Sequence, residues 1–174
     1  MGQAPCIVIA GPPGSGKSTV GPLLAKRLGV PFRDSDSDIV ARAGRPIADI
    51  FADDGEPAFR VLEEEVIAEA LAEHHGVLSV GGGAVLAEGT QKRMRDHPVV
   101  FLNVGFAVGV QRVGLSTARP LLAGVNPRAT YRSMLEARLP VYRAVATIEV
   151  DTDHRTPREV VDAITRELAL EGPQ

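Results

Sequence analysis

Apolar positions gather in short continuous runs along the chain, and longer mixed segments separate these runs. A run without polar alternation is typical of a strand that is buried on both faces of a parallel sheet. A further strand is expected at 30–36, "VPFRDSD", just after the first helical segment. The continuous runs are "CIVIA" (6–10), "VLSV" (77–80), "VVFLNV" (99–104) and "ATIEV" (146–150).

Helices are expected between the strands, and several carry recognisable end signals. Thr156 is a typical N-cap and Pro157 suits the first helical position. Glycine closes the other segments at their carboxyl ends. The alternation of strands and helices predicts a three-layer α/β fold around a parallel five-stranded sheet, with ligands beyond the carboxyl ends of the strands. The expected helical segments are 18–29, 39–44, 57–76 and 156–170.

Composition excludes several classes of function. The length of 174 residues predicts a single domain, 1–174. A net charge of −3, 4% aromatic residues and no Trp give no reason to expect nucleic acid as a partner. No apolar run is long enough for a membrane span, and the amino terminus lacks the features of a signal peptide. The single cysteine, Cys6, suits a reducing compartment, so we expect a cytoplasmic protein.

A phosphate-binding loop follows the first strand directly. The stretch "GPPGSGKST" (11–19) matches the pattern G-x-x-x-x-G-K-[ST] in the required strand–loop–helix context. Backbone amides of such a loop and the following helix N-terminus bind phosphate oxygens. Lys17 is expected to reach the β- and γ-phosphates, and the Ser18 hydroxyl to bind Mg²⁺. The nucleotide-binding residues predicted here are Gly14, Ser15, Gly16, Lys17, Ser18 and Thr19.

The loop alone does not separate kinases from GTPases or motor proteins. Many such proteins also place an acid at the end of a later strand, near the metal. Here the strand at 77–80 runs into three glycines, so the carboxylate must come from elsewhere.

Three aspartates at alternate positions, Asp34, Asp36 and Asp38, are the candidates. In an extended segment Asp34 and Asp36 point to the same side, beside the phosphate-binding loop, where they can serve Mg²⁺ and an acceptor hydroxyl. The alternative is a solvated turn that caps a helix. For Asp38 a structural role is preferred, because a negative charge in the first turn of a helix is favourable.

Taken in order, these motifs and several later ones resemble the shikimate kinase family, within the P-loop group of small-metabolite and nucleoside monophosphate kinases. The resemblance covers nearly the whole chain. It implies a P-loop kinase fold with a mobile lid and a small helical substrate-binding segment at about 33–61. The motifs are "GPPGSGKST" (11–19), "DSD" (34–36), "GRPIADIFADDGEPAFRVLE" (44–63), "GGGAV" (81–85), "RPLLAG" (119–124) and "RLPVYRAVA" (138–146).

The resemblance also assigns roles to the acids. The family pattern D-[ST]-D matches 34–36, whereas the overlapping "DSD" at 36–38 would shift the spacing by two residues. In this register Asp34 is the acid on the Mg²⁺ side, and Asp36 holds the acceptor hydroxyl as positioner or base. Asp38 matches no functional position, and as a third acid it is expected to influence the protonation of its neighbours.

The acceptor site that the resemblance implies is built from arginines and glycines. Arg60 and Arg138 are expected to bind the carboxylate of shikimate, which suits the bidentate guanidinium. Glu63, three residues after Arg60, is placed to orient it. Gly81, Gly82 and Gly83 are expected to bring backbone amides close to the hydroxyl groups of the substrate.

A lid is expected at 112–124, where glycines flank a central arginine. Arg119 would neutralise charge on the transferring phosphoryl group. The resemblance places Arg112 and Arg155 near the adenine. Tyr131, Tyr142 and the four histidines are interpreted as packing or surface residues.

Together these features imply a monomeric kinase that transfers the γ-phosphoryl group of ATP to the 3-hydroxyl of shikimate with one Mg²⁺. Two alternatives remain open. A kinase for another polyol acid such as gluconate would share the phosphate-binding loop and lid but not the ordered acceptor motifs. A nucleotide-binding regulatory module without transfer activity would have no use for Lys17, Ser18, Asp36 and Arg119 together.

Overall fold

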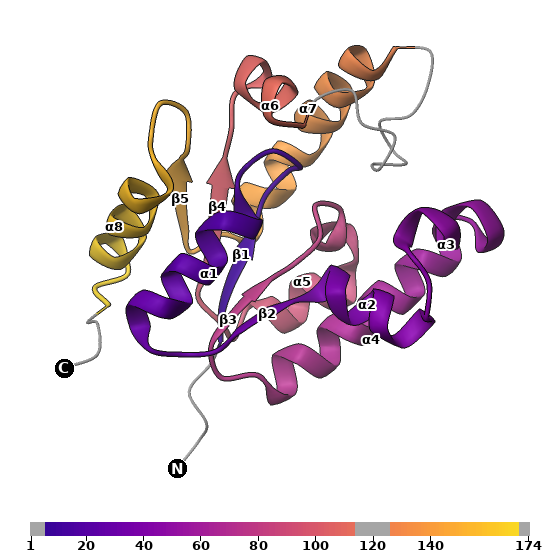
Figure 1. The fold of residues 1–174 in the computed structure, drawn as a ribbon, viewed down its shortest axis with the longest axis horizontal. Coiled ribbons are helices and arrows are strands. Elements are labelled where there is room, and N and C mark those ends of the chain that lie inside the picture. Colours follow the sequence, from indigo (N-terminus) through magenta and orange to yellow (C-terminus); the bar gives the residue numbers. More distant parts are fainter. Residues whose placement is uncertain (1–5, 114–125, 171–174) are drawn as a thin grey trace.

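A computed structural model describes residues 6–113 and 126–170 of the chain. Its strands and helices alternate along the sequence (Figure 1). The strands are β1 (Ile7–Ala10), β2 (Phe32–Asp34), β3 (Val77–Ser79), β4 (Val99–Asn103) and β5 (Ile148–Asp151). The helices are α1 (Lys17–Leu28), α2 (Ser35–Ala43), α3 (Ile47–Asp54), α4 (Glu56–Glu73), the 3₁₀ turn η1 (Ala84–Leu86), α5 (Glu88–Met94), α6 (Phe106–Val113), α7 (Pro127–Val145) and α8 (Pro157–Glu167).

The five strands form one parallel sheet in the order β2-β3-β1-β4-β5. The first strand lies in the centre, so the loop that follows it opens at the carboxyl edge between β3 and β4. Because the strands are parallel, the residues after β2, β3 and β5 open at the same edge. The predicted fold class is confirmed.

Helices cover both faces of the sheet and bury two separate apolar cores. On one face, α1 and α8 pack against Ile7, Ile9 and Val100. On the other, α4, α5 and α7 pack against Val8 and Phe101. The continuous apolar runs are thus explained, because successive side chains of each strand enter opposite cores.

A third apolar cluster lies beyond the sheet and joins α2, α3 and α4. Ile39, Ile50, Phe59 and Val66 are its buried members. Gly44 and Gly55 separate the three helices, and both adopt positive φ angles, 71° and 85°. This helical segment overlaps the predicted substrate-binding segment 33–61, and in Figure 1 it extends beside α4, away from β4 and β5.

Two of the boundaries that the structure corrects lie at the predicted site. The strand expected at 30–36 ends at Asp34, and residues 35 and 36 are helical, because the Asp34 side chain caps α2. The first two residues of the predicted lid, Arg112 and Val113, belong to α6. The rest of the lid, with Arg119, lies outside the described residues.

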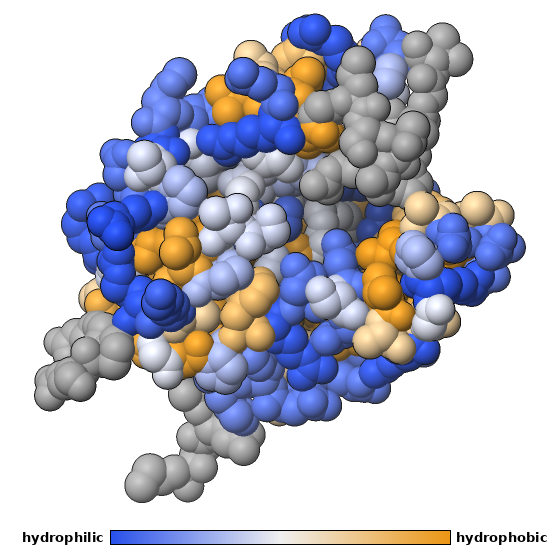
Figure 2. Space-filling view, viewed as in Figure 1, coloured by the Kyte–Doolittle hydropathy of each residue, from blue (hydrophilic) through white to orange (hydrophobic). Residues whose placement is uncertain are grey.

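Within the described residues, no helix is both long and apolar enough to cross a membrane. Figure 2 shows that apolar side chains on the visible face, outside its grey residues, form several small patches among hydrophilic ones. The exposed large apolar residues are likewise scattered: Leu23, Val40, Val61 and Leu86.

Candidate functional site

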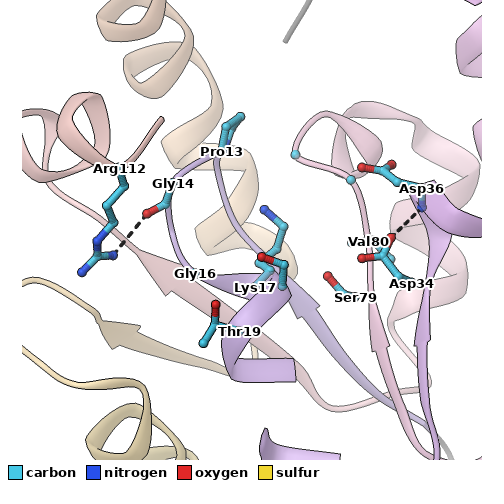
Figure 3. Close-up of a pocket in the computed structure, with 13 residues that line it drawn as sticks. Pro13, Gly14, Gly16, Lys17, Thr19, Asp34, Asp36, Ser79, Val80 and Arg112 are labelled. Atoms are coloured by element: carbon cyan, nitrogen blue, oxygen red, sulfur yellow. Dashed lines mark hydrogen bonds between the residues drawn. The ribbon is translucent and has the colours of Figure 1, made fainter. Parts of the chain in front are cut away.

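A pocket of about 350 Å³ opens at the carboxyl edge of the sheet. Figure 3 shows Lys17 between Arg112 on one side and Asp34 and Asp36 on the other. The walls of the pocket include the loop after β1, the start of α1, the end of β2 and the loop after β3. The lining residues are Pro13, Gly14, Gly16, Lys17, Ser18, Thr19, Asp34, Asp36, Ser79, Val80, Gly81, Gly82 and Arg112.

The phosphate-binding loop has the backbone that its glycines permit. Gly14 and Gly16 have φ angles of 86° and 91°, in the left-handed region that other residues adopt at a cost. Gly16 is also the N-cap residue of α1, so the positive end of the helix faces the pocket. The predicted phosphate-binding residues, apart from Ser15, line this pocket together.

Lys17 and Ser15 differ in how they contribute to the loop. Lys17 Nζ donates to the carbonyl oxygens of Gly11 at 2.7 Å and Pro12 at 3.2 Å. Ser15 is completely buried, and its hydroxyl has no hydrogen-bond partner among the described residues. Ser15 therefore lies beneath the pocket rather than on its wall.

The three aspartates have different surroundings. Asp34 Oδ1 accepts hydrogen bonds from the backbone N–H groups of Asp36 at 2.8 Å and Ser37 at 3.4 Å. Asp34 thus caps α2, as the alternative interpretation expected, and it also lines the pocket, where its role toward a metal stays a prediction. Asp36 also lines the pocket, whereas Asp38 Oδ2 accepts a hydrogen bond from Arg33 Nε at 2.6 Å.

The loop of three glycines brings the predicted acceptor residues together, because each glycine leaves room for a different side chain. A Cβ atom on Gly81 would lie 2.8 Å from Glu63 Oε2 and 3.0 Å from Asp36 Oδ1. On Gly82 it would lie 3.5 Å from Arg138 Nη1. On Gly83 it would lie 2.5 Å from Arg60 Nη2. Asp36, Arg60 and Arg138 therefore converge on one short loop.

One expectation for this loop is corrected. The Gly81 N–H donates to Ser35 Oγ at 3.1 Å, inside the protein, rather than facing a ligand. Ser35 is completely buried. The hydroxyl in the middle of the "DSD" motif therefore ties the glycine loop to the start of α2, a role that the motif did not suggest.

Glu63 orients Arg60, in the geometry expected from their spacing. Arg60 Nη1 donates to Glu63 Oε1 at 2.8 Å, and Glu63 is 3% exposed. Burial raises the pKa of the Glu63 carboxyl, while Arg60 acts in the opposite direction. The result is a polar cluster in which a buried acid holds a half-buried cation toward the glycine loop.

Arg112 joins the phosphate-binding loop to the end of β5. Its guanidinium donates to the Gly14 carbonyl at 3.1 Å, and to Thr152 Oγ1 at 3.0 Å and the Thr152 carbonyl at 3.1 Å. Arg155 is exposed in the turn after Thr152 and does not line the pocket. Arg112 and Arg155 thus lie near one segment, but only Arg112 reaches the phosphate-binding loop.

Sequence reasoning missed the contribution of α7. Tyr131 and Tyr142 are buried, and each hydroxyl donates to a loop of the site: to the Pro13 carbonyl at 2.6 Å and to the Gly82 carbonyl. The interpretation of both as packing residues is incomplete. Tyr131, Arg138 and Tyr142 are spaced by seven and four residues, which is the signal that would have placed them on one helical face.

The side-chain oxygen atoms that line the pocket are suitable ligands for a hard divalent cation. Ser18, at the start of α1, and Asp34, at the end of β2, both line the pocket and offer oxygen atoms. Across residues 6–113 and 126–170, no three His, Cys, Asp or Glu side chains gather as a metal-binding group. Mg²⁺ keeps several waters and is typically held by one or two protein oxygens plus phosphates, so this sparse set is consistent with it.

A comparison with protein families decides the relationship. The shikimate kinase family model matches residues 13–169. The chain belongs to the shikimate kinase family. The shikimate kinase of Saccharopolyspora erythraea is 60% identical over 169 residues, 97% of each chain. That of Thermobifida fusca is 52% identical and covers 99% of each chain.

Solved structures agree with membership of the shikimate kinase family. Shikimate kinase from Acinetobacter baumannii in complex with shikimate aligns with a TM-score of 0.92 at 35% identity, over 95% of this chain and 93% of that one. The Aquifex aeolicus shikimate kinase aligns with a TM-score of 0.83 at 35% identity, over 94% and 96%. A gluconokinase from Sinorhizobium meliloti aligns with a TM-score of 0.55 at 22% identity, which shows a shared fold alone.

Proposed function

We propose that this protein is a shikimate kinase that transfers the γ-phosphoryl group of ATP to the 3-hydroxyl of shikimate. The observation that supports it best is the convergence of Asp36, Arg60 and Arg138 on the glycine loop, directly beside the phosphate-binding pocket. A relative at 60% identity over 97% of the chain bears that activity in its name. Phosphoryl transfer depends on positioning and charge stabilisation, and both are available here.

The donor half of the site binds and neutralises the nucleotide phosphates. Lys17, whose Nζ lies at the carbonyl oxygens of Gly11 and Pro12, would bind the β- and γ-phosphates. Arg112, held at Gly14 and Thr152 beside the phosphate-binding loop, would lie near the adenine of the nucleotide. Arg155, just after Thr152, would lie near the adenine. Arg119, in the predicted lid at 112–124, would neutralise charge on the transferring phosphoryl group.

The acceptor half holds a carboxylate and a hydroxyl. Arg60 and Arg138 provide two guanidinium groups, and Glu63 fixes the direction of Arg60. Asp36 faces the same loop from the start of α2, so its carboxylate can accept a hydrogen bond from the reacting hydroxyl. The acid therefore aligns the oxygen for attack, and it can take the proton as the new bond forms.

The metal ion belongs between the two halves. Ser18 would hold it directly and Asp34 through water, and as Mg²⁺ it would neutralise charge on the phosphates. The Asp34 carboxylate is aimed by its own cap interactions with Asp36 and Ser37, so its position does not depend on the metal.

Coupled ADP release with purified protein tests the proposal. The assay compares shikimate, gluconate and no acceptor, in wild type, Asp36→Asn and Asp38→Asn. We expect release that needs shikimate, a fall of roughly a hundredfold or more in Asp36→Asn, and little change in the control Asp38→Asn, whose acid faces Arg33. Release with gluconate alone would contradict the acceptor, and full activity in Asp36→Asn would contradict the role of that acid.

A further inference from the structure

Helix α7 donates one hydrogen bond to each of the two loops of the site. Tyr131 near its start donates to the carbonyl of Pro13 in the phosphate-binding loop. Tyr142, three turns later, donates to the carbonyl of Gly82 in the glycine loop. Arg138 lies between them on the same helical face and interacts with the Tyr142 hydroxyl. One helix therefore contacts both loops and also carries Arg138, the arginine proposed to bind the substrate carboxylate.

The two loops held by α7 also touch one another. A Cβ atom on Gly82 would lie 3.0 Å from Pro13 Cδ and 3.6 Å from the Gly11 carbonyl oxygen. The glycine loop thus lies against the phosphate-binding loop at the point where both are bonded to α7. The separation of the loops at this point determines how far a bound acceptor stands from a bound nucleotide.

Building on the proposed function, we propose that Tyr131 and Tyr142 are positioning residues that fix the distance between the phosphoryl donor and the acceptor hydroxyl. Neither hydroxyl needs to touch a substrate for this role. Each acts through a backbone carbonyl, so that the spacing between Pro13 and Gly82 is set by the length of helix between residues 131 and 142. In-line transfer is sensitive to such spacing, because a misplacement of about 1 Å costs roughly a hundredfold in rate.

The surroundings of both tyrosines favour a fixed position over a mobile one. The Tyr142 ring stacks on Phe101 of the central sheet, with ring centroids 4.9 Å apart. The Tyr131 ring packs against Phe106 and closely against Gly109, where a Cβ atom would collide with its hydroxyl. Burial raises the pKa of Tyr142 to about 12, so its hydroxyl keeps the proton that it donates at neutral pH.

Replacing each tyrosine by phenylalanine removes the hydroxyl and preserves the ring. The measurement is the single-turnover rate of phosphoryl transfer from MgATP to shikimate, with the affinities for MgADP and shikimate measured by calorimetry. We expect Tyr131→Phe and Tyr142→Phe each to slow transfer by roughly ten- to a hundredfold, while both affinities change by less than about threefold. A merely structural role would lower the melting temperature and leave the rate of the folded protein unchanged.

The double variant and a matched control sharpen the test. Once one loop is released from α7, releasing the other should add less than about threefold, so the two effects are not multiplicative. Thr147→Val is the control, because it deletes a hydroxyl that accepts the Val99 N–H at 2.9 Å at the opposite edge of the sheet. It should leave the transfer rate within about twofold of wild type.

Three results would overturn the inference. They are unchanged single-turnover rates in both phenylalanine variants, losses explained wholly by weaker binding of one substrate, and an equal loss in Thr147→Val. A wild-type protein that shows no shikimate-dependent transfer would instead overturn the proposed function, and this inference with it.

Discussion

Asp38 illustrates how a single side chain acquires its role from its neighbours. Three acids alternate at 34, 36 and 38, and only the structure separates them by partner. Asp38 forms a 2.6 Å ion pair with Arg33, which also contacts Glu73 at 3.2 Å. This pairing raises the pKa of the Arg33 guanidinium. The charge of the third acid is thus partly balanced by Arg33, and the predicted influence of Asp38 on the protonation of its neighbours stays a prediction.

Glu63 leads to a prediction about pH and stability. Because burial raises its pKa above the ordinary 4.5, the folded protein binds a proton here that the unfolded chain releases. That contribution to stability is fully present below pH 4.5 and is lost as the pH rises through the raised pKa. The free energy of unfolding of wild type, relative to Glu63→Gln, should therefore fall as the pH rises from 4.5.

Urea unfolding of both proteins between about pH 4 and pH 8 measures this difference. Glutamine keeps the shape of the side chain and a hydrogen-bonding oxygen for Arg60, but it does not titrate. The comparison therefore isolates the effect of the charge. A difference that grows with pH would mean that the attraction to Arg60 outweighs burial.

The shortest elements of the site contact several of the longer helices around it. The glycine loop and η1 occupy few residues, yet they are in contact with α2, α4 and α7 through Ser35, Arg60 and Tyr142. The backbone φ of Gly83 is −96°, which other residues also adopt. Glycine is needed here because a side chain would take the space that Arg60 occupies. An added methyl group there acts on Arg60 directly.

Gly83→Ala is expected to weaken the acceptor site without unfolding the protein. The new Cβ would lie 2.5 Å from Arg60 Nη2, so the guanidinium must move away from its present position. We expect the KM for shikimate to rise by roughly tenfold, with a loss of stability below about 1 kcal/mol, since only the end of a flexible side chain is displaced. Initial rates at varied shikimate concentration measure the effect.

Gly89→Ala is the matched control. Gly89 lies in α5, outside the pocket lining, and its Cβ would displace the end of Glu64 in α4, which is also a charged side chain. An equal rise in KM for both variants would contradict a direct effect through Arg60.

How far the sequence predicts the elements depends on whether their signals are local. The loop at 11–19 and the start of α8 were predicted well, because glycines, Thr156 and Pro157 act on their immediate neighbours; Thr156 and Glu159 form a reciprocal capping pair. Helix α7 was not predicted as an element. Pro140 lies inside it, and a proline normally argues against a helix interior. The contacts of Ser35, Tyr131 and Tyr142 span 46 to 118 positions, so no local pattern encodes them.

At the scale of the whole molecule, the sheet depends on one tight corner. Gly76 precedes β3, and its carbonyl accepts the Ile7 N–H at 2.9 Å, while the next residue, Val77, donates to the Pro31 carbonyl at 3.0 Å. The neighbours of β3 on both sides are therefore tied to the chain at this corner. A Cβ atom on Gly76 would collide with the Pro31 carbonyl oxygen.

Gly76→Ala should accordingly destabilise the entire fold, because backbone on both sides must shift. We expect a loss of about 3 kcal/mol or more in the free energy of unfolding. Gly44→Ala provides the comparison, since its Cβ would meet nothing within 4 Å and only the φ of 71° is unfavourable. It should cost about 1–2 kcal/mol. Similar losses in both variants would contradict the steric argument.

The double use of Asp34 has a consequence for how relatives of this chain are interpreted. One carboxylate oxygen starts α2 by capping it, and that interaction is needed whether or not a nucleotide ever binds. A descendant that lost catalysis would still be selected to keep an acid or an amide at this position, for the sake of folding. The presence of Asp34 alone therefore does not indicate an active enzyme. Asp36 is the more informative residue, because its side chain does not cap α2.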